Sequence, residues 1–188
     1  MSSEPEPYMS VEEYLEFERQ AERKHEYLNG EVFAMAGASR RHVLIVTNLV
    51  GELRQQLRQR PCEVYSTDLR LRVTPTALFT YPDVIVVCGE PRFAPEDPDT
   101  LLNPLLIVEV LSESTKNYDR GEKFRHYRAL ESLQEYLLVA QETIHVEQYV
   151  KQEDGSWRLT ETEDPAAAIQ VASIGCVLPV SAIYEKVP

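Results

Sequence analysis

The amino-acid sequence predicts an α/β fold in which a central mixed β-sheet is flanked by helices. Residues 84–88 and 105–111 are apolar at odd and even positions alike, as in strands that are covered on both faces. Residues 39–57 instead repeat apolar side chains at the 3-4-3-4 spacing of an amphipathic helix that packs on a sheet: Val43, Val46, Val50, Leu53 and Leu57. These segments supply the layers of the predicted fold.

The 188 residues are most simply one domain over residues 10–188, after a disordered or loosely attached segment at residues 1–9. A content of 43% hydrophobic residues argues against general disorder. The sequence has no apolar stretch of about 18 residues and no secretory signal, so we expect a cytoplasmic protein without membrane association. Cys62, Cys88 and Cys176 are widely spaced and odd in number, and we expect reduced thiols.

The N-terminal elements have clear boundary signals. Ser10 and Glu13 form a capping box for a helix that we expect to run to about Lys24. Asn29-Gly30 is the signature of a type I′ turn, which predicts a β-hairpin between residues 25–28 and 31–35. Ser39 is the expected N-cap of the next helix.

The rest of the chain is expected to be mainly strands, over residues 62–66, 68–73, 83–88, 105–111, 136–140, 144–150 and 157–160. The connector over residues 90–103 is too polar for a crossover helix, which favours antiparallel pairing of the strands that it joins. Beyond it, Phe124, Tyr127 and Leu130 recur at helical spacing, with Asp119 as the expected N-cap.

Glu109 is the only polar residue of the apolar run over residues 104–111. An uncompensated carboxylate in such a strand costs several kcal/mol or takes up a proton. Chains retain one when it binds a metal, meets a cation or takes part in chemistry. A strand end that reaches water, or a buried arginine partner, is an equally good explanation, so the neighbouring residues must decide.

Asp83 stands at the mouth of the other apolar strand. If these strands pair antiparallel with Val87 opposite Leu105, Asp83 lies opposite Glu109 on the same face, about 5 Å away at Cβ. Two carboxylates this close repel each other unless a divalent cation lies between them. Hard oxygen ligands of this kind suit Mg²⁺ or Mn²⁺, so we expect the two carboxylates to share one ion.

Lys123 lies one turn into the helix that follows Glu109, from where its ammonium group can reach back over the end of that strand. A solvated surface lysine is the alternative. Arg120, Arg125 and Lys116 are the competing cations of the same segment.

An ordered set of motifs resembles the Uma-two family, a bacterial group of restriction-endonuclease-like proteins within the PD-(D/E)XK nuclease superfamily. The resemblance covers about residues 10–180 and is carried by these motifs: His25-Glu26-Tyr27-Leu28-Asn29-Gly30-Glu31-Val32, residues 39–49 with His42, Pro82-Asp83, Glu109-Val110-Leu111-Ser112, Tyr118-Asp119-Arg120-Gly121-Glu122-Lys123 and Glu135-Tyr136-Leu137-Leu138-Val139.

The resemblance implies a restriction-endonuclease-like fold and hydrolysis of DNA phosphodiester bonds that depends on Mg²⁺ or Mn²⁺. It implies that Asp83, Glu109 and the backbone carbonyl of Val110 bind the metal. It also implies that Lys123 orients or activates the attacking water, or steadies the developing phosphate charge. The superfamily lysine follows the glutamate by two residues, where this chain has Leu111; related families supply the lysine from the next helix, which fits Lys123.

Two accessory residues are weaker candidates. Glu26 resembles a glutamate that some superfamily members add to the metal site, although a surface acid of a hairpin is an equally good explanation. His42 lies in the first turn of its helix beside Arg40 and Arg41, and it is a candidate contact to substrate phosphate or a support for the active site. A histidine at a helix start is more often structural or solvated.

A formal net charge of −12 opposes binding to nucleic acid by the molecule as a whole. Residues 39–72 nevertheless hold seven arginines against three acids, and residues 116–128 hold five Lys or Arg against two acids. We expect double-stranded DNA as the partner, and a homodimer with one active site for each strand. Two alternatives stay open: a non-catalytic dimeric DNA-binding or interaction module on the same fold, and a metal-dependent hydrolase of a small phosphorylated molecule.

Overall fold

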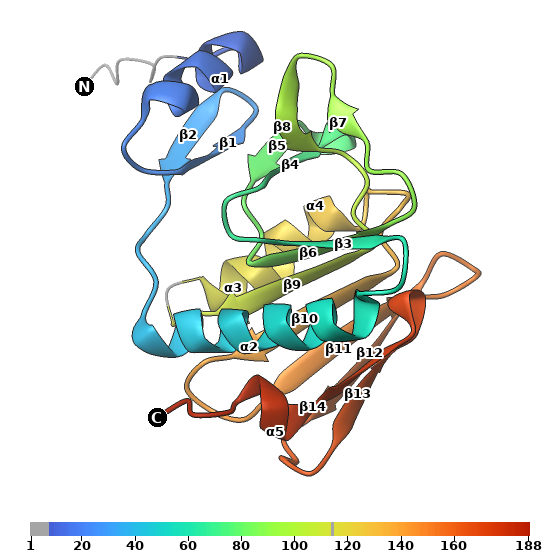
Figure 1. Ribbon diagram of the computed structural model, residues 1–188. Coiled ribbons are helices and arrows are strands. Elements are labelled where there is room, and N and C mark those ends of the chain that lie inside the picture. Colours follow the sequence, from blue (N-terminus) through green and yellow to red (C-terminus); the bar gives the residue numbers. More distant parts are fainter. Residues whose placement is uncertain (1–7, 114) are drawn as a thin grey trace.

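The computed structural model describes residues 8–113 and 115–188, which form two six-stranded β-sheets with helices packed on and between them (Figure 1). The central sheet has the strand order β12-β11-β10-β9-β6-β3, with β9 and β10 as its parallel pair. The second sheet has the order β2-β1-β5-β4-β8-β7, with β4 and β8 parallel. The predicted fold class, α/β with a mixed sheet flanked by helices, is confirmed.

The strands of the central sheet are β3 (Cys62–Ser66), β6 (Val84–Cys88), β9 (Leu106–Leu111), β10 (Glu135–Ala140), β11 (Val146–Lys151) and β12 (Trp157–Thr162). Those of the second sheet are β1 (His25–Leu28), β2 (Glu31–Ala34), β4 (Arg70–Val73), β5 (Leu78–Thr80), β7 (Phe93–Ala94) and β8 (Asp97–Leu101). A separate hairpin consists of β13 (Ala168–Val171) and β14 (Cys176–Pro179). The helices are α1 (Val11–Gln20), α2 (Arg40–Leu57), α3 (Lys116–Tyr118), α4 (Phe124–Tyr127) and α5 (Val180–Ile183), with short 3₁₀ turns at Thr74–Thr76 and Ala172–Ile174.

The central sheet is covered on both faces. Helix α2 lies along one face beside α5 and the β13–β14 hairpin (Figure 1), and alternate strand residues such as Val84 and Val108 join the core on that side. The intervening residues, such as Ile85 and Ile107, point to the other face, where the second sheet and α4 pack against them. All six residues of β9 are buried, and by this alternation Glu109 faces the layer between the two sheets.

The N-terminal elements follow their local signals. Ser10 and Glu13 make both hydrogen bonds of the predicted capping box, and Asn29 and Gly30 have φ of 49° and 98°, as the predicted type I′ turn requires. Helix α1 ends at Gln20, earlier than predicted, because Lys24 already belongs to the extended chain and its carbonyl oxygen accepts a hydrogen bond from Met35 N at 2.9 Å. Of the segment expected to be loosely attached, residues 1–7 lie outside the described residues.

The helix after β9 begins before the predicted N-cap. Helix α3 continues through a π-helical turn, Asp119–Lys123, into α4, and Asp119 has helical φ and ψ of −64° and −41°. Asp119 is therefore an internal, buried residue of this helix, and the prediction that it caps the N-terminus was wrong. The helix starts near Thr115 instead, whose N–H donates to the hydroxyl of Ser112 at 3.2 Å.

Several strands escaped the sequence analysis. The polar connector over residues 90–103 contains β7 and β8, because its acids are paired rather than solvated: Asp97 is buried and forms an ion pair with Arg70 at 2.8 Å. Strands β5, β13 and β14 are too short or too mixed in polarity to give a period-2 pattern. None of the helices in the described ranges has the length and hydropathy needed to cross a lipid bilayer.

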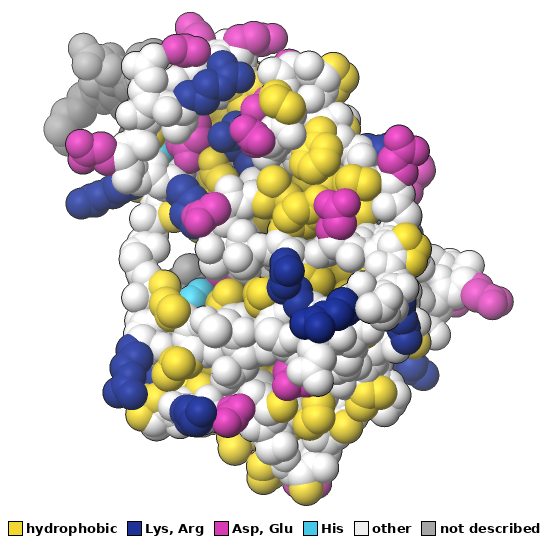
Figure 2. Space-filling model, in the orientation of Figure 1, with side chains coloured by type: hydrophobic (Ala, Val, Ile, Leu, Met, Phe, Trp, Pro, Cys, Tyr) yellow, Lys and Arg dark blue, Asp and Glu magenta, His cyan; other side chains and the backbone are white. Residues whose placement is uncertain are grey.

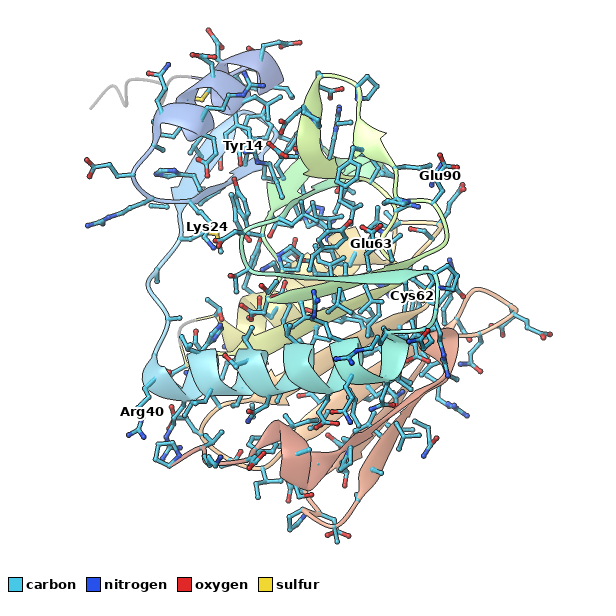
Figure 3. The ribbon with its side chains drawn as sticks, in the orientation of Figure 1. Tyr14, Lys24, Arg40, Cys62, Glu63 and Glu90 are labelled. Atoms are coloured by element: carbon cyan, nitrogen blue, oxygen red, sulfur yellow. A yellow bond between two sulfur atoms is a disulfide. The ribbon has the colours of Figure 1, made fainter. Side chains whose placement is uncertain are left out.

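The expectation of three reduced cysteines was wrong. Cys62 in β3 lies directly opposite Cys88 in β6, and the two form a disulfide (Figure 3 labels Cys62 where β3 begins). Spacing along the chain cannot reveal such a pair, because its proximity comes from the register of two strands that are joined by a long excursion. Cys176 is the free cysteine and is buried.

Candidate active site

Asp83 and Glu109 are brought together by the pairing of β6 with β9. The two strands are antiparallel with Val84 opposite Val108, and extending this register by one residue places Asp83 opposite Glu109, as expected from the sequence. Asp83 precedes β6, and its Oδ2 accepts a hydrogen bond from Val110 N at 2.7 Å. The carboxylate of Asp83 therefore caps the end of β9 next to Glu109.

Glu109 is 4% exposed and is the only charged residue of β9. Its Oε1 accepts hydrogen bonds from the Tyr127 hydroxyl at 2.7 Å and contacts the Lys123 ammonium at 2.9 Å. Burial is the largest influence on this carboxyl and raises the pKa of Glu109 to about 8. Lys123 opposes the rise, whereas the charges of Asp83 and Asp119 add to it.

Lys123 lies in the site rather than in solvent. Its side chain is buried, and its Nζ lies 2.9 Å from Glu109, 3.2 Å from Glu26 and 3.6 Å from Asp119. Burial lowers the pKa of Lys123, but the three carboxylates outweigh it and hold the pKa well above its usual value. The ammonium group is therefore charged and neutralises part of the acidic cluster.

The competing cations lie elsewhere. Arg120 forms an ion pair with Glu147 at 2.6 Å, on the side of the helix that faces β11. Arg125 pairs with Glu122 and Lys116 pairs with Glu113, in both cases through side chains that are at least one-third exposed. Among these residues, Lys123 alone contacts Glu109 in the described structure.

Glu26 enters the site from the second sheet. It lies on β1, where its Oε1 contacts the Lys123 ammonium and also accepts a hydrogen bond from the Thr80 hydroxyl of β5. Since Asp83 and Glu109 come from the central sheet, the acidic cluster lies between the two sheets. The reading of Glu26 as a surface acid does not hold, because its side chain is directed inward.

His42 supports Asp83. Ser39 caps α2 by accepting a hydrogen bond from His42 N at 3.1 Å, and the imidazole Nε2 of His42 lies 2.9 Å from Asp83 Oδ1. The Ser39 hydroxyl also donates to Gln141 at 2.6 Å, which ties the start of α2 to the loop after β10. The helix start thus fixes the orientation of His42, which in turn fixes that of Asp83.

The sequence analysis missed three members of the site. Asp119 was interpreted as a cap, Tyr127 as a core residue, and Thr80 was not considered. Asp119 precedes Lys123 by four residues and Tyr127 follows it by four, so helical spacing alone could have placed all three on one face. Thr80 leaves no such signal, because its contact with Glu26 joins two strands from distant parts of the sequence.

The donor set fits a hard divalent cation. In the described ranges, no three Asp, Glu, His or Cys side chains converge as a complete set of metal ligands. Mg²⁺ retains several waters and needs only one or two carboxylates, which Asp83 and Glu109 supply. The carbonyl of Val110 faces the same side as its N–H, toward Asp83. Four acids surround one lysine here, and this excess of negative charge also favours a cation.

Comparisons with known proteins agree with this arrangement. A family model named Uma2, with the description "Putative restriction endonuclease", matches residues 11–181. Two "uncharacterized" proteins of Synechocystis sp., slr1290 and sll1609, are 38% and 39% identical to this chain; the alignments cover 97% and 86% of this chain and 95% and 92% of those proteins. A crystal structure described as "a putative nuclease belonging to DUF820", from Anabaena variabilis, superposes with a TM-score of 0.75 at 18% identity and covers 94% of this chain and 97% of that chain. At that identity the likeness concerns the fold.

Proposed function

The chain belongs to the Uma2 (Uma-two) family, and from that membership and the geometry around Glu109 we propose that it is a metal-dependent endonuclease that hydrolyses DNA phosphodiester bonds. The observation that carries the proposal is the contact between the buried Lys123 ammonium and Glu109. The chain has Leu111 where the superfamily motif has its lysine, and Lys123 supplies the missing cation from the following helix.

Each residue of the site has a defined task in this proposal. Asp83, Glu109 and the Val110 carbonyl hold Mg²⁺ or Mn²⁺, with Glu26 as an accessory acid and His42 fixing Asp83. When bound, the ion lowers the pKa of a water molecule and polarises a phosphoryl oxygen. Lys123 places a fixed positive charge beside the scissile phosphate, where negative charge develops in the transition state. Tyr127 keeps Glu109 in position through its hydroxyl.

The charge distribution supports DNA as the substrate. Acidic side chains gather around α1, away from the site, whereas basic side chains lie at both ends of α2 (Figure 2). Arg40 at the start of α2 is exposed and points away from the body of the protein (Figure 3). The same end of α2 carries His42, so cations that attract phosphate lie next to the proposed metal site.

Plasmid cleavage tests the proposal. Supercoiled DNA is incubated at low salt with Mg²⁺ or Mn²⁺ and with the wild type, Glu109→Gln, or Glu122→Gln as a matched control, since Glu122 is an exposed acid of the same helix. We expect nicking by the wild type and the control, and no nicking by Glu109→Gln or with EDTA. DNA binding without nicking would identify a non-catalytic module instead. Hydrolysis of bis-p-nitrophenyl phosphate with DNA left intact would identify a hydrolase of small phosphodiesters.

A further inference from the structure

Asp119 is a buried acid of the site to which the proposed chemistry assigns no task. It is 3% exposed, and its Oδ1 lies 3.6 Å from the ammonium of Lys123. Unlike Asp83 and Glu109, it lies on the helix and not on the sheet. An acid buried next to two other carboxylates is costly to retain, which indicates that Asp119 serves the lysine that it contacts.

The π-helical turn directs both side chains inward. It spans Asp119–Lys123, so one wide turn separates the acid from the lysine and both residues are buried. The Tyr136 hydroxyl donates to the backbone carbonyl of Asp119 at 3.2 Å, which fixes the turn against β10. Turns of this kind are uncommon and often occur at functional sites.

Asp119 is also held from the other side. Its carboxylate forms a hydrogen bond with the Thr115 side chain, one turn earlier in the helix. The hydroxyl of Thr115 is in turn 2.9 Å from that of Ser112, at the end of β9. The carboxylate is therefore restrained by Thr115, and it needs no metal to keep its position.

The other two partners of Lys123 have a second task. Glu109 is a proposed metal ligand and Glu26 an accessory one, and a divalent cation on Glu109 attracts that carboxylate while it repels the ammonium. The metal and Lys123 thus compete for Glu109. Asp119 is the partner that Lys123 keeps when the metal binds, because both residues belong to the same helical turn.

We propose that Asp119 is the positioning residue of Lys123: it retains the ammonium beside the scissile phosphate when the divalent cation takes over Glu109. The inference rests on the proposed nuclease function. In the metal-free protein Lys123 neutralises Glu109, and in the metal-bound protein Asp119 anchors Lys123 for its contact with phosphate. The same contact prevents Lys123 from leaving the site as a mobile surface side chain.

A double-mutant cycle tests the inference. Wild type, Asp119→Asn, Lys123→Gln and the double variant are compared by plasmid cleavage and by calorimetric titration with Mn²⁺, and Glu122→Gln is the matched control. We expect Asp119→Asn to lower kcat by about tenfold or more with KM for DNA changed by less than about twofold, and to have little further effect once Lys123 is Gln. Lys123→Gln should bind Mn²⁺ about tenfold more tightly, because its ammonium no longer competes for Glu109.

Three results would overturn the inference. The first is an unchanged kcat for Asp119→Asn. The second is an equal loss of Mn²⁺ affinity from Asp119→Asn in both backgrounds, which would make Asp119 act on the metal itself. The third is Mn²⁺ binding by Lys123→Gln no tighter than that of the wild type. If the wild type neither binds Mn²⁺ nor cleaves DNA, the proposed function fails instead.

A second variant covers the case in which Asp119→Asn does not fold. Thr115→Val removes the hydroxyl that restrains Asp119 and changes a residue that is only partly buried. We expect kcat to fall by about threefold or more with KM for DNA unchanged. An unchanged kcat in a folded Thr115→Val protein, together with an Asp119→Asn variant that cannot be purified, would reduce Asp119 to a structural residue.

Discussion

The ammonium of Lys123 lies 2.9 Å from Oε1 of Glu109, and both side chains are almost completely buried. The two residues come from different elements, a strand of the central sheet and the helix that follows it. Their contact joins the most costly acid of the sheet to the only cation that the helix directs inward among its described residues. Four of the five predictions below follow from this pair and its neighbours.

Lys123→Met is expected to abolish cleavage and to weaken the fold. It removes the positive charge from three buried carboxylates, so we expect cleavage to fall by about a hundredfold or more. The uncompensated acids should lower the free energy of unfolding by about 3–5 kcal/mol at neutral pH. Plasmid nicking and urea denaturation measure the two effects. Lys116→Met, which affects an exposed pair, should change neither, and full activity of Lys123→Met would disprove the role of this lysine.

The stability of the metal-free protein should fall as pH rises toward 8. The pKa of Glu109 is raised to about 8 from an ordinary value of 4.5, so within this window the folded state retains a proton that the unfolded state has lost. The slope of the free energy of unfolding with pH is therefore negative, up to about 1.4 kcal/mol per pH unit for one proton. Urea denaturation in EDTA between pH 5 and 8 measures it. Glu109→Gln should flatten the slope, and an equal slope in both proteins would contradict the prediction.

Tyr127→Phe should affect Glu109 without altering the packing. The substitution removes the hydroxyl that donates to Glu109 at 2.7 Å and leaves a buried acceptor with one partner fewer. We expect a loss of about 1–2 kcal/mol in the free energy of unfolding and a smaller but measurable loss of cleavage. Because this hydrogen bond lowers the pKa of Glu109, its removal should raise that pKa further. Tyr149→Phe, whose hydroxyl contacts Glu147 away from the site, is the control.

Reduction of the Cys62–Cys88 disulfide should destabilise the protein without removing the site. The bond closes a segment with a sequence separation of 26. A loop of that length corresponds to about 3.5 kcal/mol of stabilisation through the unfolded state. Thermal or urea unfolding with and without dithiothreitol measures the difference. A variant with alanine at both positions should be insensitive to the reductant, and wild-type protein that is equally insensitive would show that the bond does not form in solution.

The protein should form a homodimer with two active sites for the two strands of a duplex. Light scattering at micromolar concentration should then return twice the chain mass of 21.6 kDa. The Lys123→Met variant should give the same mass, because the site lies between the sheets and not on the surface. A mass of one chain across the concentration range would reject the dimer.

Local sequence signals were sufficient for those parts of the fold that are local. The capping box at Ser10, the Asn29-Gly30 turn and the helix after Ser39 each depend on residues within a few positions of one another. The pairing of β6 with β9 was also predictable, because a polar connector without a helix leaves antiparallel pairing as the short connection. That register is what placed Asp83 opposite Glu109 in the prediction.

Long-range contacts were beyond the reach of sequence patterns. The disulfide and the Glu26–Thr80 hydrogen bond join strands whose partners the sequence does not specify. The second sheet was missed for the same reason, since β7 and β8 are stabilised by the buried pair of Asp97 with Arg70 and not by an apolar pattern. Asp119 was misread because helical spacing does not reveal a π-helical turn.

The order in which the chain is synthesised gives the position of Lys123 a further consequence. Glu26, Asp83 and Glu109 all leave the ribosome before the lysine that neutralises them. A nascent chain that ends before α3 holds the acids without their cation, so closing the two sheets over them would bury unpaired charge. Folding of this layer is therefore expected to wait for the helix, and the cluster delays collapse until the nascent chain is long enough to complete the site.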